Sequence, residues 1–335
     1  MHPPLSVLEF TDPACPWAWG SEPTFRRLRS ALADQARWRR VYGILFDPAE
    51  DDPAPDPAAE TAWYQGFVDD VCRHTGAPAA RRLEWVCLNS WPASLAATAA
   101  LAQGVAPAER VLRRLREQTF VRGRPADTEA AVLAAVDGIP GLDVDRLARD
   151  LASTDVLNQV RADRALTRSP GAEVLGPAAP AAAGDSPHPG RAKETPDGFR
   201  YALPTVVLEG PAGRAVVPGW RPLGEYLDAV RRVAPEVRLA GRLPSAESAL
   251  ARWRTLTAPD LVLLSDDKCP PATALEIRLR HGSLWVHPDE RNLDRIYRQL
   301  TDCGPDATVV PMISSFVGVA CRYVDLLRTA SAVCR

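Results

Sequence analysis

The stretch Phe-Thr-Asp-Pro-Ala-Cys-Pro-Trp-Ala-Trp-Gly at residues 10–20 decides the fold, because it joins a predicted strand to a predicted helix through a single cysteine. Upstream, residues 5–10 alternate in polarity and carry β-branched and aromatic side chains, which predicts a strand. Downstream, apolar residues recur at helical spacing over residues 25–32, and Pro16 suits a first helical turn because it has no N–H to leave unpaired. Residues 38–46 predict a second strand, which completes a strand–helix–strand unit.

Cys15 falls at the predicted N-terminus of that helix. Unpaired backbone N–H groups and the positive end of the helix dipole stabilise a thiolate there, so we expect a lowered pKa and a nucleophilic sulfur. A buried, inert cysteine is the alternative interpretation. The flanking Asp12-Pro13 and Pro16-Trp17 pairs favour the functional one.

The region after this unit is predominantly helical. The acidic, proline-rich residues 47–57 predict a linker. Beyond it, Pro107 is placed to open one helix and Asp143 to cap another. From residue 169 to residue 197, the density of proline, alanine and glycine leaves little room for regular structure.

Strand patterns then return at residues 201–209 and 214–218, as a hairpin, and Pro222 opens a further helix. The order of elements is β-α-β, a helical insertion, then β-β-α. This order predicts an α/β protein with a thioredoxin-like fold that is interrupted by an all-helical insertion domain.

The pattern changes again beyond residue 237. It predicts a small winged-helix-like extension and then an apolar helix or helix pair: short helices at 249–253, 257–264 and 271–277, a strand at 283–286, and the apolar segment at 309–333. We therefore expect a thioredoxin-like domain at 1–52 plus 185–236, a helical insertion and linker at 53–184, a winged-helix-like extension at 237–300, and a C-terminal helical tail at 301–335.

Composition narrows the class of function. The chain has 335 residues and a net charge of −2, which gives no electrostatic reason to expect a nucleic-acid partner. No apolar run approaches the ~18 residues needed to cross a bilayer, so no membrane association is expected. The first residues lack the basic and apolar segments of a secretion signal. Seven cysteines without a Cys-x-x-Cys pair argue against a disulfide framework, and we expect a cytoplasmic protein.

Residues 10–19 resemble the active-site segment of DsbA-like thioredoxin-fold proteins, in particular the FrnE-like branch. That family carries a Cys-x-x-Cys pair there, usually Cys-Pro-Trp-Cys. Its second hallmark is a cis-proline opposite the cysteines, which Leu203-Pro204-Thr205 matches. The segment at residues 89–93 resembles the part of the insertion that faces the active site. The resemblance spans about residues 5–235, and some members carry an extension similar to residues 238–295.

The resemblance implies a site around Cys15 as the catalytic residue. The residues expected to bind a substrate or thiol there are Pro16, Trp17, Ala18, Trp19, Asn89, Trp91, Leu203, Pro204 and Thr205. The three tryptophans are equally consistent with plain core packing. No metal is expected, because the spacing of Cys269, His281, His287 and Cys303 fits no zinc pattern.

One departure from the family limits the chemistry. Ala18 stands where the second cysteine of the pair belongs, so the site cannot hold an internal disulfide. A single thiolate can still form a mixed disulfide that an external thiol resolves, add to an electrophile, or orient a thiol ligand. No cofactor is expected to be bound, although a low-molecular-weight thiol can serve as co-substrate.

Two classes of function remain open. The first is a cytoplasmic, monothiol DsbA-like enzyme, acting as a thiol-dependent oxidoreductase, isomerase or thiol transferase on a small molecule or a protein disulfide. The second is a non-redox thioredoxin-fold adaptor or scaffold that binds a protein partner. A DNA-binding regulator that uses the C-terminal extension ranks last, because its arginines alternate with acids.

Overall fold

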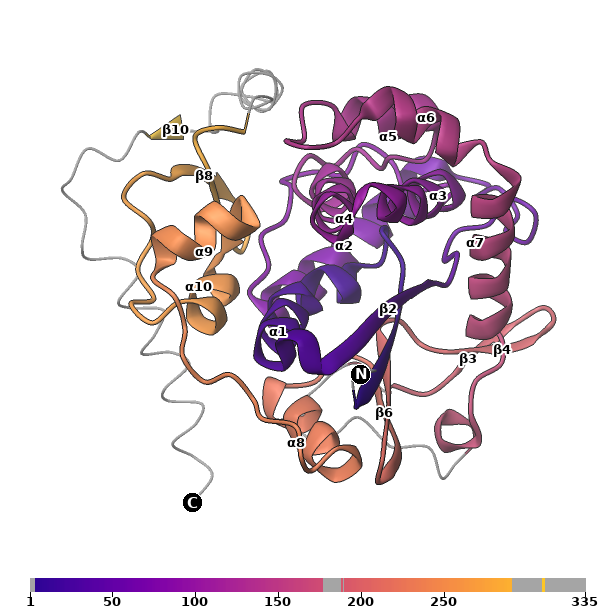
Figure 1. Ribbon diagram of the computed structural model, residues 1–335. Coiled ribbons are helices and arrows are strands. Elements are labelled where there is room, and N and C mark those ends of the chain that lie inside the picture. Colours follow the sequence, from indigo (N-terminus) through magenta and orange to yellow (C-terminus); the bar gives the residue numbers. More distant parts are fainter. Residues whose placement is uncertain (1–3, 177–187, 189, 291–308, 311–335) are drawn as a thin grey trace.

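A four-stranded mixed sheet forms the centre of the computed structural model, which describes residues 4–176, 188, 190–290 and 309–310. The strand order is β2-β1-β5-β6. Strands β1 and β2 are parallel, and β5 runs antiparallel to both β1 and β6. The strands are β1 (Leu5–Thr11), β2 (Ala36–Tyr42), β5 (Thr205–Gly210) and β6 (Gly213–Pro218). This arrangement confirms the thioredoxin-like α/β fold (Figure 1).

Two helices pack on this sheet, one from the beginning and one from the end of the domain's sequence. Helix α1 (Pro16–Leu32) follows β1, and helix α8 (Leu223–Val233) follows β6. Phe25 and Tyr226 meet edge to face between them, with ring centroids 5.5 Å apart. Val7 and Val206 on the sheet complete this fully buried layer, so the first and last parts of the domain share one core.

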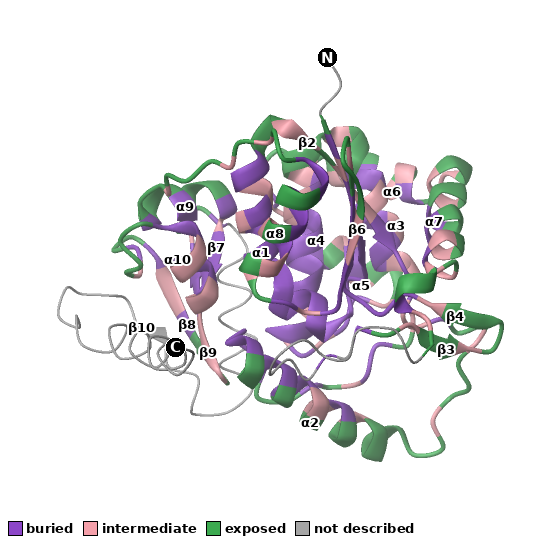
Figure 2. Ribbon diagram, turned by 90° about the horizontal axis from the view of Figure 1, so that it is seen from below, coloured by how far each residue is buried: buried purple, intermediate pink, exposed green. Residues whose placement is uncertain are grey.

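The insertion is helical, as expected. Asp56 caps its first helix by accepting from two backbone N–H groups, and Asp143 caps the helix predicted to begin there. The helices are α2 (Pro57–Thr75), α3 (Trp91–Ala99), α4 (Val105–Phe120), α5 (Glu129–Val136), α6 (Val144–Leu151) and α7 (Thr154–Thr167), with short 3₁₀ turns at Ala33–Gln35, Ala100–Gln103 and Ala172–Val174. Figure 2 shows α4 beside α1, with most of both helices buried.

Three segments between residues 36 and 210 differ from their predicted structure. Strand β2 ends at Tyr42 rather than residue 46, and β5 begins at Thr205 rather than residue 201. Both extra segments are loops that border the cavity described below. A small hairpin of β3 (Lys193–Thr195) and β4 (Gly198–Arg200) lies at the end of the stretch expected to lack regular structure.

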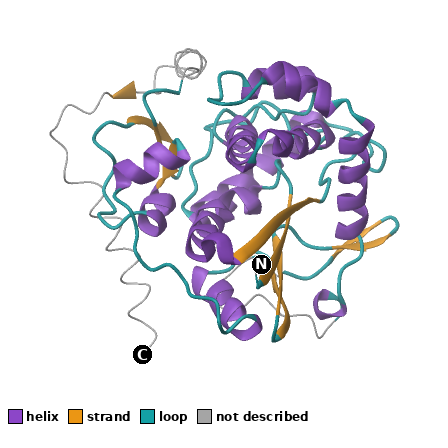
Figure 3. Ribbon diagram, in the orientation of Figure 1, coloured by secondary structure: helices purple, strands orange, loops and turns teal. Residues whose placement is uncertain are grey.

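The part of the chain that follows α8, described at residues 246–290 and 309–310, is called the C-terminal unit below. It keeps two of its three predicted helices (Figure 3). The predicted helix at 271–277 is wrong, because Leu275 and Ile277 alternate along a strand that turns back at His281. The elements are α9 (Ala246–Trp253), β7 (Thr255–Thr257), α10 (Ala258–Leu264), β8 (Leu275–Leu279) and β9 (Gly282–Val286), in a sheet of order β10-β8-β9-β7.

The predicted apolar helix at 309–333 lies almost entirely outside the described residues. Its first two residues form the short strand β10 (Val309–Val310), which pairs with β8 rather than starting a helix.

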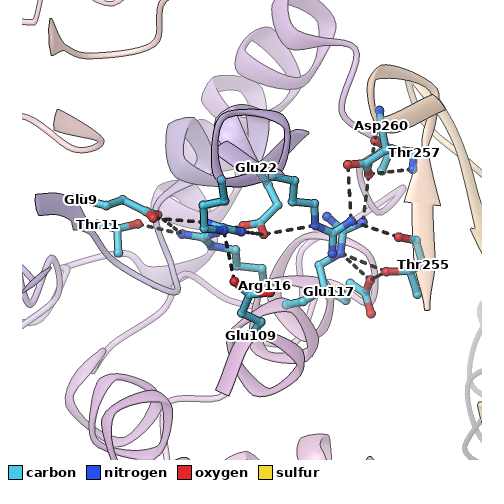
Figure 4. A network of polar contacts seen from close by, with 12 residues as sticks. Glu9, Thr11, Glu22, Glu109, Arg116, Glu117, Thr255, Thr257 and Asp260 are labelled. Atoms are coloured by element: carbon cyan, nitrogen blue, oxygen red, sulfur yellow. Dashed lines mark hydrogen bonds and ion pairs between the residues drawn. The ribbon is translucent and has the colours of Figure 1, made fainter. Parts of the chain in front are cut away.

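Buried charges join the C-terminal unit to the rest of the molecule. Arg26 on α1 donates to the Thr255 backbone oxygen at 3.0 Å and lies 3.3 Å from a carboxylate oxygen of Asp260 on α10. The same network runs inward through Glu22 to Arg116 on α4 (Figure 4). It therefore spans three regions that are distant in sequence.

Candidate functional site

Cys15 is placed by the turn between β1 and α1, where it is the N-cap residue of the helix. Asp12 shapes this turn, because its carboxylate accepts from the backbone N–H of Ala14 and of Leu45, both at 2.8 Å. Only 3% of Cys15 is exposed. The predicted position at a helix N-terminus is therefore correct, and the side chain is buried there.

The electrostatic expectation for Cys15 is wrong. Burial raises the pKa of the thiol to about 11, and the negative charge of Asp12 acts in the same direction. The backbone N–H of Ala18 and the charges of Arg116 and Arg200 lower it, but they do not compensate. With that pKa, about one molecule in ten thousand carries a thiolate at pH 7.

The thiol is tied to the carbonyl of Leu203. Its sulfur donates to the Leu203 oxygen at 3.4 Å, and the peptide bond between Leu203 and Pro204 is cis. Segments that are 188 positions apart thus meet at this hydrogen bond.

The Leu203 carbonyl has a second donor. His188 Nε2 lies 3.1 Å from the same oxygen, while His188 Nδ1 accepts from the Gly190 N–H at 3.0 Å. This pair of contacts assigns the ring proton to Nε2. Burial lowers the pKa of His188 to about 4, so the ring is neutral at pH 7. Both lone pairs of the Leu203 oxygen are therefore occupied.

A cavity of about 1230 Å³ opens beside Cys15. Four of the predicted site residues line it: Cys15, Pro16, Trp17 and Leu203. Its apolar wall comes from the loop after β2, from α2 and from the loop before α3, and consists of Leu45, Phe46, Tyr64, Phe67, Val71, Val86, Cys87 and Leu88. The insertion therefore supplies most of the surface that faces the cysteine.

The other predicted site residues do not line this cavity: Ala18, Trp19, Asn89, Trp91, Pro204 and Thr205. Trp19 points into the core, where its Nε1–H donates to the Pro78 oxygen at 3.0 Å and its ring stacks on Phe120. Asn89 caps the following turn by accepting from the backbone N–H of Trp91. These residues support the local structure instead of forming a cavity wall.

Sequence reasoning missed the wall supplied by α2. Tyr64, Phe67, Val68 and Val71 recur at the spacing of one helical face, and that pattern was sufficient to find it. His188 carried no such signal, because it lies in a stretch of proline, alanine and glycine.

Charges at the cavity are of both signs. Its acidic members are Glu50, Asp51, Asp52, Glu60 and Asp70, and its basic members are Lys193 and Arg200. Glu50 is already paired with Arg164 and Arg168. Within the described part of the chain, no cluster of side chains is arranged to hold a metal ion. Nor is any helix there long and apolar enough to cross a membrane.

Comparisons with known proteins agree with this fold. A family model described as thioredoxin matches residues 8–174. Two curated relatives are ClpXP adapter proteins SpxH. The one from Shouchella clausii is 28% identical over 163 residues, which is 48% of this chain and 52% of the relative. The one from Halalkalibacterium halodurans is 27% identical over 168 residues, which is 49% and 55%. The chain thus spans about half the length of these curated relatives.

Among solved structures, a candidate protein disulfide isomerase from Nitrosomonas europaea has a TM-score of 0.50 and 16% identity, over 68% of this chain and 97% of that one. The cytosolic disulfide reductase DsbM from Pseudomonas aeruginosa has a TM-score of 0.44 and 17% identity, over 66% and 91%. At such identities the first likeness concerns the fold alone. Together with the family match, it leads to one conclusion: the chain has a thioredoxin-like fold, with a Cys15–Leu203 junction that resembles the active site of DsbA-like proteins.

Proposed function

We propose that this protein is a DsbA-like adaptor that binds a segment of a partner protein in the cavity beside Cys15 without turning over disulfides. One observation carries the proposal: the only thiol of the active-site turn is buried and protonated, and Ala18 replaces its partner. A dithiol cycle needs a thiolate that attacks and a second thiol that resolves the mixed disulfide.

The shape of the cavity supports a macromolecular ligand. Its volume of about 1230 Å³ exceeds the roughly 300–1,000 Å³ of pockets for small molecules. Apolar surface continues beyond it, since Leu88 at its wall is 64% exposed and Trp63 is 70% exposed. The Trp63 ring stacks on Phe67, which lines the cavity. Exposed aromatic groups beside a large apolar cavity are typical of protein-binding surfaces.

The curated relatives also support an adaptor, because both are named as adapter proteins. Their similarity covers about half of this chain. The four described cysteines are all free thiols, which supports the expected cytoplasmic location.

Peptides selected from a random library against the purified protein provide the test. We expect the selected peptides to bind wild-type protein and Cys15→Ser with equal affinity. Leu88→Asp should weaken them at least tenfold, because it places a charge in the apolar wall. Leu101→Asp is the matched control, since Leu101 is also exposed but lies outside the cavity. Equal binding by Leu88→Asp and wild type would contradict the proposal.

A second candidate is a monothiol enzyme, in which the Cys15 sulfur attacks a disulfide of a small thiol. The Cys15–S–S–R bond forms as the S–S bond of the small disulfide breaks, and the leaving RS⁻ takes the proton of the Cys15 thiol. A different thiol then attacks the R sulfur, which regenerates Cys15 and leaves that thiol joined to R in a new disulfide. The observation in its favour is that Arg200 and Lys193 line the same cavity as Cys15, where they can hold carboxylates of a small thiol and stabilise a thiolate. Mass spectrometry after incubation with oxidised glutathione tests it. A stoichiometric adduct at Cys15, released by added thiol, supports the enzyme, and an unmodified Cys15 excludes it.

A further inference from the structure

A second, much smaller crevice lies between helix α4 and the C-terminal unit. Its volume is about 20 Å³, and its charged lining consists of Arg110, Arg113, Arg114, Glu117, Arg254 and Glu290. About 10–15 Å³ suffices for one water molecule, so this crevice has room for a single species of that size.

The carboxylates of the crevice are already engaged. Glu290 binds Arg114 through one oxygen and Arg254 through the other. Glu117 Oε1 accepts from Arg113 Nε at 2.7 Å and from the Thr255 hydroxyl at 2.6 Å. Neither carboxylate therefore has an oxygen that lacks a cationic or hydroxyl neighbour.

The guanidinium groups are only partly satisfied. Among the described residues, Arg113 Nη1 and Nη2 and Arg114 Nη1 are buried without a hydrogen-bond partner. The Asp260 carboxylate lies 3.6 Å from Arg113 Nη2. Trp19 covers the face of the Arg113 guanidinium group, so a ligand can reach this group only at its N–H edges. Buried donors without an acceptor destabilise a fold, and charged donors do so most, so these N–H groups favour an acceptor in the crevice.

The surroundings do not neutralise this positive charge. Four guanidinium groups face two carboxylates in the lining itself. The next charges out are the exposed Asp289 beside Arg254 and one connected network, in which Asp260, Glu22, Glu9 and Glu109 pair with Arg26, Arg29, Arg40 and Arg116. Counting these leaves the cluster positive. Burial, and then the charge of Arg113, lower the pKa of Arg26 to about 9, while Asp260 and Glu117 raise it.

We propose that this crevice binds one small monovalent anion of the size of chloride, which joins α4 to the C-terminal unit. The anion accepts from the unpaired N–H groups of Arg113 and Arg114 and offsets the excess charge. The crevice is too small for phosphate or sulfate. This inference is independent of the function proposed for the Cys15 cavity.

Thermal unfolding of the full chain in sodium chloride and in sodium gluconate, at equal ionic strength, tests the proposal. Gluconate is too large for the crevice. We expect Tm to rise in chloride only, linearly with the logarithm of chloride concentration above Kd, and the folding equilibrium constant to increase about tenfold when chloride reaches ten times its Kd. Coincident curves in the two salts would overturn the proposal.

The site itself is tested by Arg114→Lys and by bromide. The chloride-specific shift should be lost in Arg114→Lys and retained in Arg231→Lys, whose arginine forms an exposed pair with Asp228. Because Arg114→Lys can also unfold the protein, crystals of wild type in sodium bromide give a second measurement. An anomalous peak between Arg113 and Arg114 is the expected result, and its absence refutes the site.

Discussion

Two opposing influences act on the sulfur of Cys15. The first turn of α1 offers the backbone N–H of Ala18, which favours the thiolate, whereas burial favours the thiol and prevails. The sequence shows the helix start but not the burial, because Val71 and Tyr201, which pack in the same cluster, come from other regions of the chain. A local pattern therefore predicted the position of this residue correctly and its acidity wrongly.

Alkylation measures this acidity directly. At pH 7 we expect iodoacetamide to modify the exposed Cys269 well before the buried Cys15. The rate at Cys15 should rise about tenfold per pH unit until the pH approaches the thiol pKa of about 11, because only the thiolate reacts. Peptide mapping after timed labelling gives both rates. Labelling of Cys15 ahead of Cys269 at pH 7 would show that its environment is not the apolar one described here.

Ala18→Cys restores the family's pair of cysteines. Residue 18 lies three positions beyond the N-cap, and its N–H already contacts the Cys15 sulfur, so we expect an internal disulfide under oxidising conditions. The reduced variant should also gain activity on a protein disulfide that wild type lacks. Mass spectrometry with and without reductant measures the bond, and Ala18→Ser is the control. A variant that stays fully reduced in oxidised glutathione contradicts the placement of residue 18.

At the scale of elements, regular structure could be predicted wherever one local pattern sufficed. The alternation of apolar and polar side chains at residues 5–10 correctly predicted strand β1, and the capping residue Asp143 correctly predicted the start of helix α6. The helix expected at 271–277 was wrong because Leu275 and Ile277 suit either period over so short a run, and only pairing with β9 decides between them. The apolar face of α2 could likewise be predicted from its helical spacing, whereas the loop residues of the cavity wall needed tertiary information.

The segment around His188 gives an element-scale prediction. The side chain of His188 occupies one of the two acceptor positions of the Leu203 carbonyl. His188→Ala should therefore free that position, cost about 1 kcal/mol of stability, and strengthen binding of extended peptides in the cavity. Calorimetric titration with the selected peptides measures the gain, and His287→Ala in the C-terminal unit is the control. An unchanged affinity would mean that ligands do not pair with this carbonyl.

At the scale of the whole molecule, buried ion pairs attach the C-terminal unit to helices α1 and α4. Asp260 is fully buried on α10 and faces Arg26 and Arg113 from other regions of the chain. Breaking a buried ion pair by removing one charge typically costs about 3–5 kcal/mol, because the other charge is left without compensation. The network thus makes the attachment of the C-terminal unit dependent on individual side chains.

Asp260→Asn tests this dependence with almost no change in shape. We expect a loss of about 3–5 kcal/mol in the free energy of unfolding, measured by urea titration with circular dichroism. Asp228→Asn, which breaks an exposed pair with Arg231, should cost less than about 1 kcal/mol. Equal losses in the two variants would show that the buried network contributes no more than a surface pair.

The same network has an evolutionary consequence. Because Arg26 and Arg113 are buried against Thr255 and Asp260, a homologue that lost the C-terminal unit would leave both arginines without these partners. Deletion of the unit and replacement of these arginines by apolar or small residues should therefore occur together in descent. Homologues that end near the equivalent of residue 240 are expected to lack both arginines. We therefore expect the unit to be inherited together with the domain and not as an exchangeable module.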